Sequence, residues 1–92
     1  MKLVDPTDFD VLEVFEDGRN VATNVADELG HDRAYLNTRL PHLQDHGLLE
    51  KVGPAANSGL YELTDRGQAA LGARDQYDDV GPDGFAALVE DA

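Results

Sequence analysis

The chain has 92 residues, of which 19 are acidic and 7 are basic, so its formal net charge is -12. This length provides one small domain with a modest core and excludes a deep substrate cleft between two lobes. The sequence contains no cysteine, which excludes disulfides and thiolate metal sites. No apolar run approaches the roughly 20 residues of a membrane span, and the N-terminus lacks the apolar region of a signal peptide. We therefore expect a soluble, cytoplasmic protein with no membrane partner.

The acidic residues are dispersed along the chain, and Asp is more frequent than Glu. Concentrated salt screens the repulsion between such charges within a few ångströms. A dispersed acidic surface is therefore what we expect of a protein from a halophilic source. The same surface argues against a nucleic-acid partner, because nucleic acids are themselves acidic.

The first predicted helix begins after Pro6 and ends at Gly18. Its apolar positions are Phe9, Val11, Leu12, Val14 and Phe15. Thr7 is the expected N-cap. The acids Asp8 and Asp10 suit the positive end of the helix dipole.

A very short extended piece at residues 20–22 leads into a second, short helix. Thr23 is its expected N-cap, and Gly30 ends it. Its buried stripe consists of Val25, Ala26 and Leu29. Only residues 31–33 separate it from a longer helix. A short helix, a tight turn containing glycine and a longer helix are the pattern of a helix-turn-helix.

The third predicted helix is the most basic one of the chain. Leu36, Leu40 and Leu43 recur at intervals of four and three residues and therefore line one face. The other positions carry Arg33, Tyr35, Asn37, Thr38, Arg39 and His42. Pro41 removes a backbone hydrogen bond, costs about 3 kcal/mol in an ordinary helix interior and predicts a kink. Gly47 is placed to end the helix in a left-handed conformation.

Two strand-like segments, residues 48–52 and 60–64, flank a stretch rich in glycine and polar residues. This arrangement predicts a hairpin with a long tip. In the second segment Tyr61 and Leu63 alternate with Glu62, so that one edge faces the core and the other faces water.

A fourth helix begins at Thr64, its expected N-cap, and its apolar residues are Ala69, Ala70 and Leu71. The acidic stretch that follows is broken at Gly81 and Pro82. Beyond the break, a short amphipathic helix is predicted by Phe85, Leu88 and Val89, which lie at i, i+3 and i+4. We therefore divide the chain into a domain at residues 1–74 and a tail at residues 75–92. The sequence leaves the dimer interface open between the apolar face of this tail, the first helix and the fourth helix.

The order of these elements resembles that of winged helix-turn-helix transcription regulators. The segment VADELGHDRAYLNTRLPHLQDHGLLEKVG (residues 25–53) is similar to their helix-turn-helix and the start of their wing. The segment GLYELTDRGQAAL (residues 59–71) is similar to the return of the wing into the last helix. The resemblance covers residues 8–73. Within the family the chain is most similar to small haloarchaeal regulators grouped with the phage PhiH1 repressor, which fits its acidity.

The resemblance implies a mainly α fold with a small β-hairpin (α+β), built from a three-helix core, a two-stranded wing and an additional C-terminal helix. The residues that we expect in its core are Val11, Leu12, Phe15, Val25, Leu29, Leu36, Leu40, Leu43, Leu48, Tyr61, Leu63 and Leu71. A structure in which Leu36 and Leu40 point to solvent would contradict this register.

The resemblance also implies a function, which is sequence-specific binding of double-stranded DNA by a homodimer that represses transcription. In the family the N-terminal half of the recognition helix enters the major groove. Carried over by position, the contacting residues are Arg33, Tyr35, Asn37, Thr38 and Arg39, with Asn57 and Ser58 at the wing tip and Thr23 at the start of the second helix. Arginine can pair with guanine and asparagine with adenine, and a helix N-terminus favours a phosphate.

A plainer interpretation exists for each of these residues, because polar helix faces, hairpin tips and helix caps occur in most proteins. The alternative function is a winged-helix module that binds another protein through the same face, since a fold does not by itself determine function. The acidic surface favours the protein partner, whereas the cluster of Arg33, Asn37 and Arg39 favours DNA.

No catalytic role is expected. No carboxylate pair is marked by apolar, desolvating neighbours, and no glycine-rich phosphate loop precedes a helix. His42 and His46 are spaced i, i+4 with Asp45 between them, which suits two metal ligands, but no third ligand is evident. We therefore expect no metal and no cofactor, and the sequence specifies no small-molecule effector.

Overall fold

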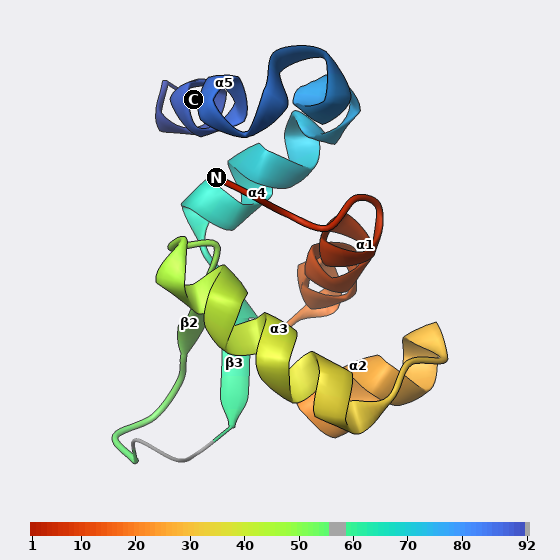
Figure 1. Ribbon diagram of the computed structural model, residues 1–92. Helices are drawn as coiled ribbons and strands as arrows, with labels where there is room; N and C mark the ends of the chain where they lie inside the picture. The colour runs from red at the N-terminus through yellow and green to blue at the C-terminus, as the bar shows by residue number, and fades with distance from the viewer. Residues whose placement is uncertain (56–58, 92) are drawn as a thin grey trace.

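The computed structural model describes residues 1–55 and 59–91, and its elements follow the order expected of a winged helix-turn-helix (Figure 1). They are α1 (Thr7–Val14), the 3-10 helix η1 (Phe15–Asp17), β1 (Asn20–Val21), α2 (Ala22–Leu29), α3 (Arg33–Asp45), β2 (Leu49–Lys51), β3 (Leu60–Leu63), α4 (Asp65–Gly72), the 3-10 helix η2 (Arg74–Gln76) and α5 (Tyr77–Glu90). The expected fold class, mainly α with a small antiparallel sheet, is thus confirmed. Asn57 and Ser58, the predicted wing-tip contacts, lie outside the described residues.

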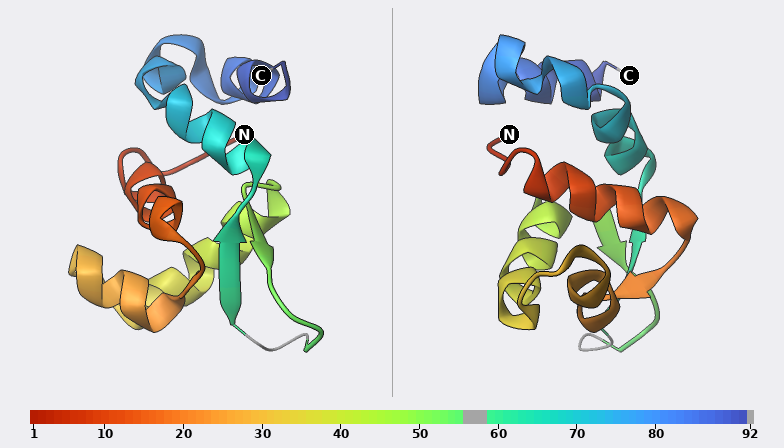
Figure 2. Two further views of the ribbon diagram at one scale, coloured as in Figure 1. Left: turned by 180° about the vertical axis from the view of Figure 1, so that it is seen from behind. Right: turned by 90° about the vertical axis from the view of Figure 1, so that its right-hand side faces the viewer.

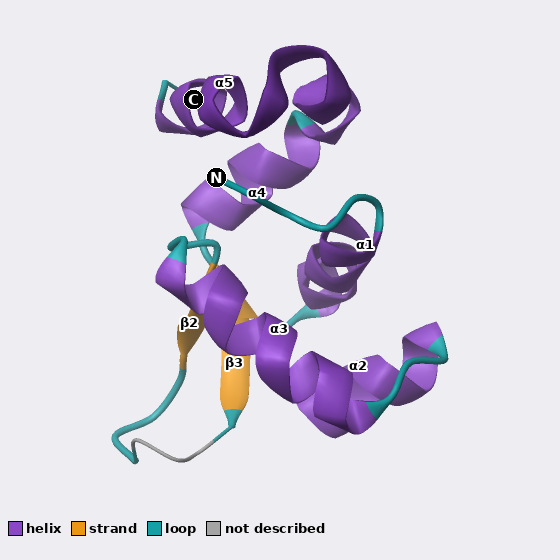
Figure 3. Cartoon of the chain, viewed as in Figure 1, coloured by secondary structure: helices purple, strands orange, loops and turns teal. Residues whose placement is uncertain are grey.

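The sheet has three strands in the order β1-β3-β2, and both pairings are antiparallel (Figure 3). The hairpin of β2 and β3 was predicted, and its register places Leu49 opposite Leu63. The two-stranded wing that we expected gains a third strand, because Asn20 and Val21 pair with Tyr61 and Leu60. Two residues are too few to carry a strand pattern of their own, so only their partner strand reveals the pairing.

The core lies where α1, α2 and α3 meet the sheet. The leucine stripe of α3 is fully buried, because Leu36, Leu40 and Leu43 are at most 1% exposed. Burying one such side chain stabilises the fold by roughly 1.5–3 kcal/mol. Of the predicted core residues, Leu29 and Leu63 are half-buried and pack against the core, and the others are buried. The register of the recognition helix is therefore confirmed.

Helix ends follow the local sequence only in part. At α4 the predicted cap is confirmed, because the Thr64 hydroxyl accepts a hydrogen bond from the Gly67 N–H at 2.9 Å. The predicted caps at Thr7 and Thr23 are wrong, since both residues lie inside their helices and the flanking residues provide no side-chain cap. Gly30 ends α2 with a φ of 72°, the left-handed conformation that glycine adopts without strain.

The recognition helix α3 runs as one helix from Arg33 to Asp45 and continues through Pro41. Pro41 is exposed, so its ring faces away from the core. The helix ends as predicted, with Gly47 following it at a φ of 76°. The Leu48 N–H then donates to the Leu43 carbonyl at 3.0 Å and leads the chain into β2.

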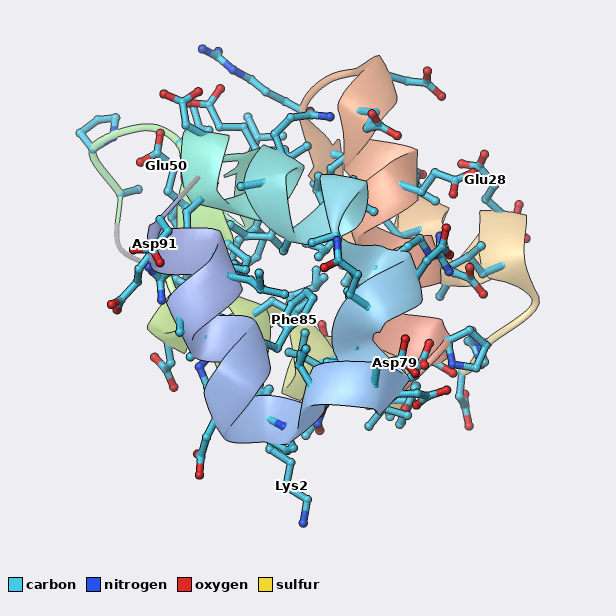
Figure 4. All side chains as sticks on the ribbon, turned by 90° about the horizontal axis from the view of Figure 1, so that it is seen from above. Lys2, Glu28, Glu50, Asp79, Phe85 and Asp91 are labelled. Carbon is cyan, nitrogen blue, oxygen red and sulfur yellow. The ribbon has the colours of Figure 1, made fainter. Side chains whose placement is uncertain are left out.

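The C-terminal helix α5 belongs to the core of the molecule. It bends at Gly81, whose φ of 72° and ψ of 176° interrupt the helical backbone where the sequence predicted a break. Beyond the bend Phe85 is fully buried and Val89 is 4% exposed. Phe85 and Val89 are therefore not the exposed apolar face that we expected. The contribution of the tail to a dimer interface stays a prediction. Figure 4 shows Phe85 in the interior beneath α5, whereas Glu28, Glu50, Asp79 and Asp91 lie around the periphery.

An N-terminal arm, residues 1–6, passes beneath α5 on its way to α1 (Figure 2). The Leu3 N–H donates to the Tyr77 hydroxyl at 2.9 Å, and the N-terminal ammonium donates to the Pro82 carbonyl at 2.9 Å.

No helix within the described residues is both long and apolar enough to cross a membrane.

Candidate nucleic-acid interface

The helix-turn-helix is formed by α2 and α3, which pack directly on each other. The turn between them is closed by the His31 N–H, which donates to the Ala26 carbonyl at 2.9 Å. The Leu36 face of α3 is held against the core, so the residues on the opposite side of its N-terminal half face solvent. The sequence predicted this orientation from the leucine spacing alone.

Three of the predicted contact residues on α3 are exposed. Arg33, Asn37 and Thr38 lie on the solvent side, and the Thr38 hydroxyl makes one long contact, 3.4 Å, to the Ala34 carbonyl. Within the described part of the chain, Arg33 makes no ion pair. These side chains are therefore available to a partner.

Tyr35 and Arg39 are placed differently from what we expected. Tyr35 is half-buried, packs against the core, and lies with its ring centroid 5.5 Å from that of His31. Arg39 has a side chain that is only 14% exposed, because its guanidinium points towards α1 and forms an ion pair with Asp8. The expected exposure of Arg39 is wrong.

The ion pair between Asp8 and Arg39 joins α1 to α3. The Arg39 Nε donates to Asp8 Oδ1 at 2.9 Å, and its terminal nitrogen donates to Oδ2 at 2.5 Å. The Val4 N–H donates to the same Oδ2 at 2.7 Å, so the fully buried carboxylate is satisfied on both oxygens. The hydrogen bond to Asp8 raises the pKa of Arg39 above its ordinary value.

Helical spacing contains a signal for this pair that our sequence analysis missed. Asp8 lies at i relative to Leu12 at i+4 and Phe15 at i+7, which places it on the apolar face of its helix. Arg39 lies beside the leucine stripe of α3, at i+3 from Leu36. Two opposite charges on the buried faces of two helices indicate a partnered pair, because an isolated buried charge is too costly.

A hollow of about 400 Å³ opens between α3, the start of α2 and the sheet. The side chains that matter for a ligand are Thr23, Arg33, Asn37, Lys51 and Tyr61. None of the described residues that line it is acidic. By contrast, a second hollow beside α1 and α2 is lined by five carboxylates, Asp10, Glu13, Glu16, Asp17 and Glu28. The described lining of the hollow beside α3 therefore differs in charge from that of the hollow beside α1 and α2.

Lys51 and Tyr61 are site residues that the sequence analysis did not select. They come from β2 and β3 and face each other in the sheet, with the Lys51 Nζ 5.9 Å from the centroid of the Tyr61 ring. Burial raises the pKa of the Tyr61 hydroxyl. Their proximity to Arg33 depends on how the sheet packs on α3, which the strand pattern does not specify.

The two histidines of α3 lie away from this hollow, in the C-terminal half of the helix. Their Nε2 atoms are 3.2 Å apart, and both side chains are half-buried. Burial, assisted by His42, lowers the pKa of His46 below its ordinary value. No group of three or more His, Cys, Asp or Glu side chains among the described residues is arranged to hold a metal ion.

Comparison with known proteins gives one informative similarity. No protein-family model matches the chain, and no curated protein matches it. Among solved structures, the oxidized form of MarR from E. coli matches with a TM-score of 0.61 and 25% sequence identity over 96% of this chain. The chain spans 63% of the length of that MarR chain. It therefore has a winged helix-turn-helix fold similar to that of MarR.

Proposed function

We propose that the protein is a transcription regulator that binds double-stranded DNA through the outer face of α3 and the adjoining hollow. The observation that carries this proposal is the separation of charge. Arg33 and Lys51 both line a hollow that has no acidic residue among its described lining residues, on a chain whose formal net charge is -12. DNA is attracted by such a site and repelled by the remaining surface. The similarity to MarR supports the same conclusion.

The exposed side chains have the chemistry to read bases and hold phosphates. Arg33 can bond guanine O6 and N7 together, and Asn37 can bond adenine N6 and N7 in the same way. Lys51 and Thr23 line the hollow and would contact the phosphate backbone. Asn57 and Ser58 remain proposed contacts at the wing tip, and Tyr35 and Thr38 remain proposed contacts on α3.

Arg39 has a different role in this proposal. Because its guanidinium is occupied by Asp8, it holds α3 in place and leaves base recognition to its neighbours. A planar, bidentate pair orients a helix more firmly than a single contact does. Arg39 is therefore a positioning residue.

The finer parts of the proposal concern how the regulator acts. We infer that it is a homodimeric repressor, because specific sites normally consist of two half-sites about 10 base pairs apart, and one short recognition helix covers only one. The dispersed acidic surface supports a halophilic archaeal source, close to the PhiH1 repressor group, and the function supports a cytoplasmic location.

The test first selects DNA sequences that bind the protein and then measures the affinity of each variant for the selected DNA. DNA selected from a random pool in molar KCl should bind the parent, and Arg33→Ala should weaken that binding by about 5- to 150-fold, equivalent to about 1–3 kcal/mol. Arg19→Ala is the matched control, because it removes the same charge from an exposed residue that lines a different hollow. Its affinity should equal that of the parent. Fluorescence anisotropy measures the DNA affinity of both variants.

Two outcomes would contradict the proposal. If Arg33→Ala binds the selected DNA as tightly as the parent, α3 is not the contact surface. If no sequence is enriched from the pool, the second candidate function, a module that binds another protein, becomes the better one. The hollow lined by five carboxylates favours a basic protein partner in that case.

A further inference from the structure

Where the N-terminal arm passes α3, two atoms that can donate a lone pair lie within 3.2 Å of a third such atom, His42 Nε2. His42 and His46 lie on consecutive turns, and their Nε2 atoms are 3.2 Å apart. The carbonyl oxygen of Lys2 lies 3.1 Å from the His42 Nε2. Lys2 is separated from the two histidines by most of α1, α2 and α3, so this group forms only in the folded chain.

One proton satisfies these three atoms only if two acceptors share it. A neutral imidazole carries one N–H and one lone pair. If the proton is on His42 Nε2, the Lys2 carbonyl and His46 Nε2 must share it. If it is on His46 Nε2, the bare His42 nitrogen faces the lone pairs of the carbonyl. A cation in the middle would accept a lone pair from all three atoms.

The distances suit a first-row transition metal. Zinc lies about 2.0–2.1 Å from imidazole nitrogen, so two nitrogens 3.2 Å apart subtend about 100° at the ion. The Lys2 oxygen and His42 Nε2, 3.1 Å apart, subtend about 95° at similar bond lengths. Both angles lie between those of octahedral and tetrahedral coordination.

We propose that one divalent transition metal ion, such as zinc, binds to His42, His46 and the Lys2 carbonyl oxygen. Imidazole is a ligand that zinc, copper and nickel prefer, and water would complete the coordination. With two side chains and one carbonyl, the site binds more weakly than a structural site of four side chains. The third ligand comes from the backbone, which explains why the spacing of the histidines alone indicated only two.

A bound ion would connect three parts of the molecule. It would tie the N-terminal arm to the C-terminal half of α3 through Lys2. The same arm is already bonded to α5, since Leu3 N–H donates to Tyr77 and the N-terminal ammonium donates to Pro82. Because the ligands assemble only in the folded chain, binding should stabilise the native state.

The first experiment measures zinc binding by the full chain, purified without a histidine tag. Calorimetry is run with Mg²⁺ in large excess, because Mg²⁺ prefers oxygen ligands and occupies the carboxylates. We expect one zinc ion per chain and an increase in Tm on adding zinc. His42→Gln and His46→Gln should each abolish both effects. His31→Gln is the matched control and should retain them, because His31 is exposed in the turn before α3.

The second experiment assigns the ligands in the unaltered chain, so that an unstable variant cannot obscure the result. Zinc should shift the imidazole ¹⁵N resonances of His42 and His46 and leave those of His31 unchanged. The proposal is overturned if zinc changes neither Tm nor these resonances. It is also overturned if the Gln variants, folded by circular dichroism, bind zinc as the parent does. None of these outcomes depends on whether the protein binds DNA.

Discussion

At the scale of single residues, the ion pair of Asp8 and Arg39 determines how α3 sits on α1. Removing a carboxylate from water is costly, and the cost is offset here by three hydrogen bonds from Arg39 and the Val4 N–H. Asp8 is fully buried, so the pair is screened little by salt, in contrast to the exposed ion pairs. Loss of one partner would leave the other charge without compensation.

Arg39→Ala should therefore lower the free energy of unfolding by about 3–5 kcal/mol. Urea denaturation followed by circular dichroism measures this. The double variant Asp8→Ala, Arg39→Ala should lose less than the sum of the two single variants, because no buried charge remains. Arg33→Ala should stay within about 0.5 kcal/mol of the parent, since its side chain is exposed. Equal losses of unfolding free energy for Arg33→Ala and Arg39→Ala would contradict this role of the ion pair.

At the scale of elements, α4 approaches the start of the wing so closely that only glycine fits at the contact. A Cβ at Gly67 would overlap the Leu48 carbonyl oxygen and lie 2.5 Å from Leu63 Cδ1. The Thr64 hydroxyl links the same two regions, since it caps α4 and donates to the Gly47 carbonyl at 2.6 Å. The first turn of α4 thus holds β2 and β3 against the core.

Gly67→Ala should destabilise the protein by about 1–3 kcal/mol, because backbone or core side chains must shift to make room. Gly72→Ala is the matched control at the other end of the same helix, where a Cβ would meet nothing within 4 Å. That change should stabilise the protein by about 0.4–1 kcal/mol. Thermal unfolding of the two variants checks the opposite signs. If the stability of both variants changes in the same direction, the contact between Gly67 and Leu48 does not limit the side chain at this position.

At the scale of the whole molecule, an aromatic cluster joins the two ends of the chain. Phe9, Tyr77 and Phe85 pack edge to face, with centroids 5.1 to 5.7 Å apart. Such pairs contribute about 0.5–1.5 kcal/mol beyond the area that they bury. The C-terminal helix is therefore held by the same core as α1. The boundary that we placed after residue 74 stays a prediction.

Phe85→Ala should reduce the free energy of unfolding by about 3–5 kcal/mol, because it leaves a cavity in this cluster. Val80 lies in the same helix and is 40% exposed, so Val80→Ala should change stability by less than about 0.5 kcal/mol. Deletion of residues 84–92 removes Phe85 and Val89 from the core and should likewise destabilise the fold. Urea denaturation tests all three, and a stable deletion variant would contradict the packing role of α5.

The net charge of the molecule governs how the proposed DNA binding responds to salt. A basic protein loses affinity steeply, with a log-log slope of roughly -0.9 per phosphate neutralised. Here each basic residue has an exposed carboxylate next to it in the chain, Asp32 before Arg33 and Glu50 before Lys51. Such carboxylates require cations between them and the phosphates. Affinity should therefore change little, or even increase, between about 0.5 and 2 M KCl. Anisotropy titrations measure the slope, and a steep decline would show that the two basic contacts dominate.

The sequence by itself determined the features that depend on neighbouring residues. The leucine stripe of α3, the Thr64 cap and the glycine ends at Gly30 and Gly47 follow from helical spacing and backbone preference. These local features were sufficient for the order of elements and the winged-helix fold. They also placed Arg33 and Asn37 on the exposed face of the recognition helix.

Only the tertiary structure decided which distant groups meet. It paired β1 with β3, buried Phe85 in the core, directed Arg39 to Asp8 and made Lys51 and Arg33 line the same hollow. In the proposed metal site it supplied a backbone oxygen that no side-chain pattern reveals. The physical reason is that each of these contacts joins residues far apart in the chain, so their geometry depends on how the elements pack and on which buried charges must be compensated.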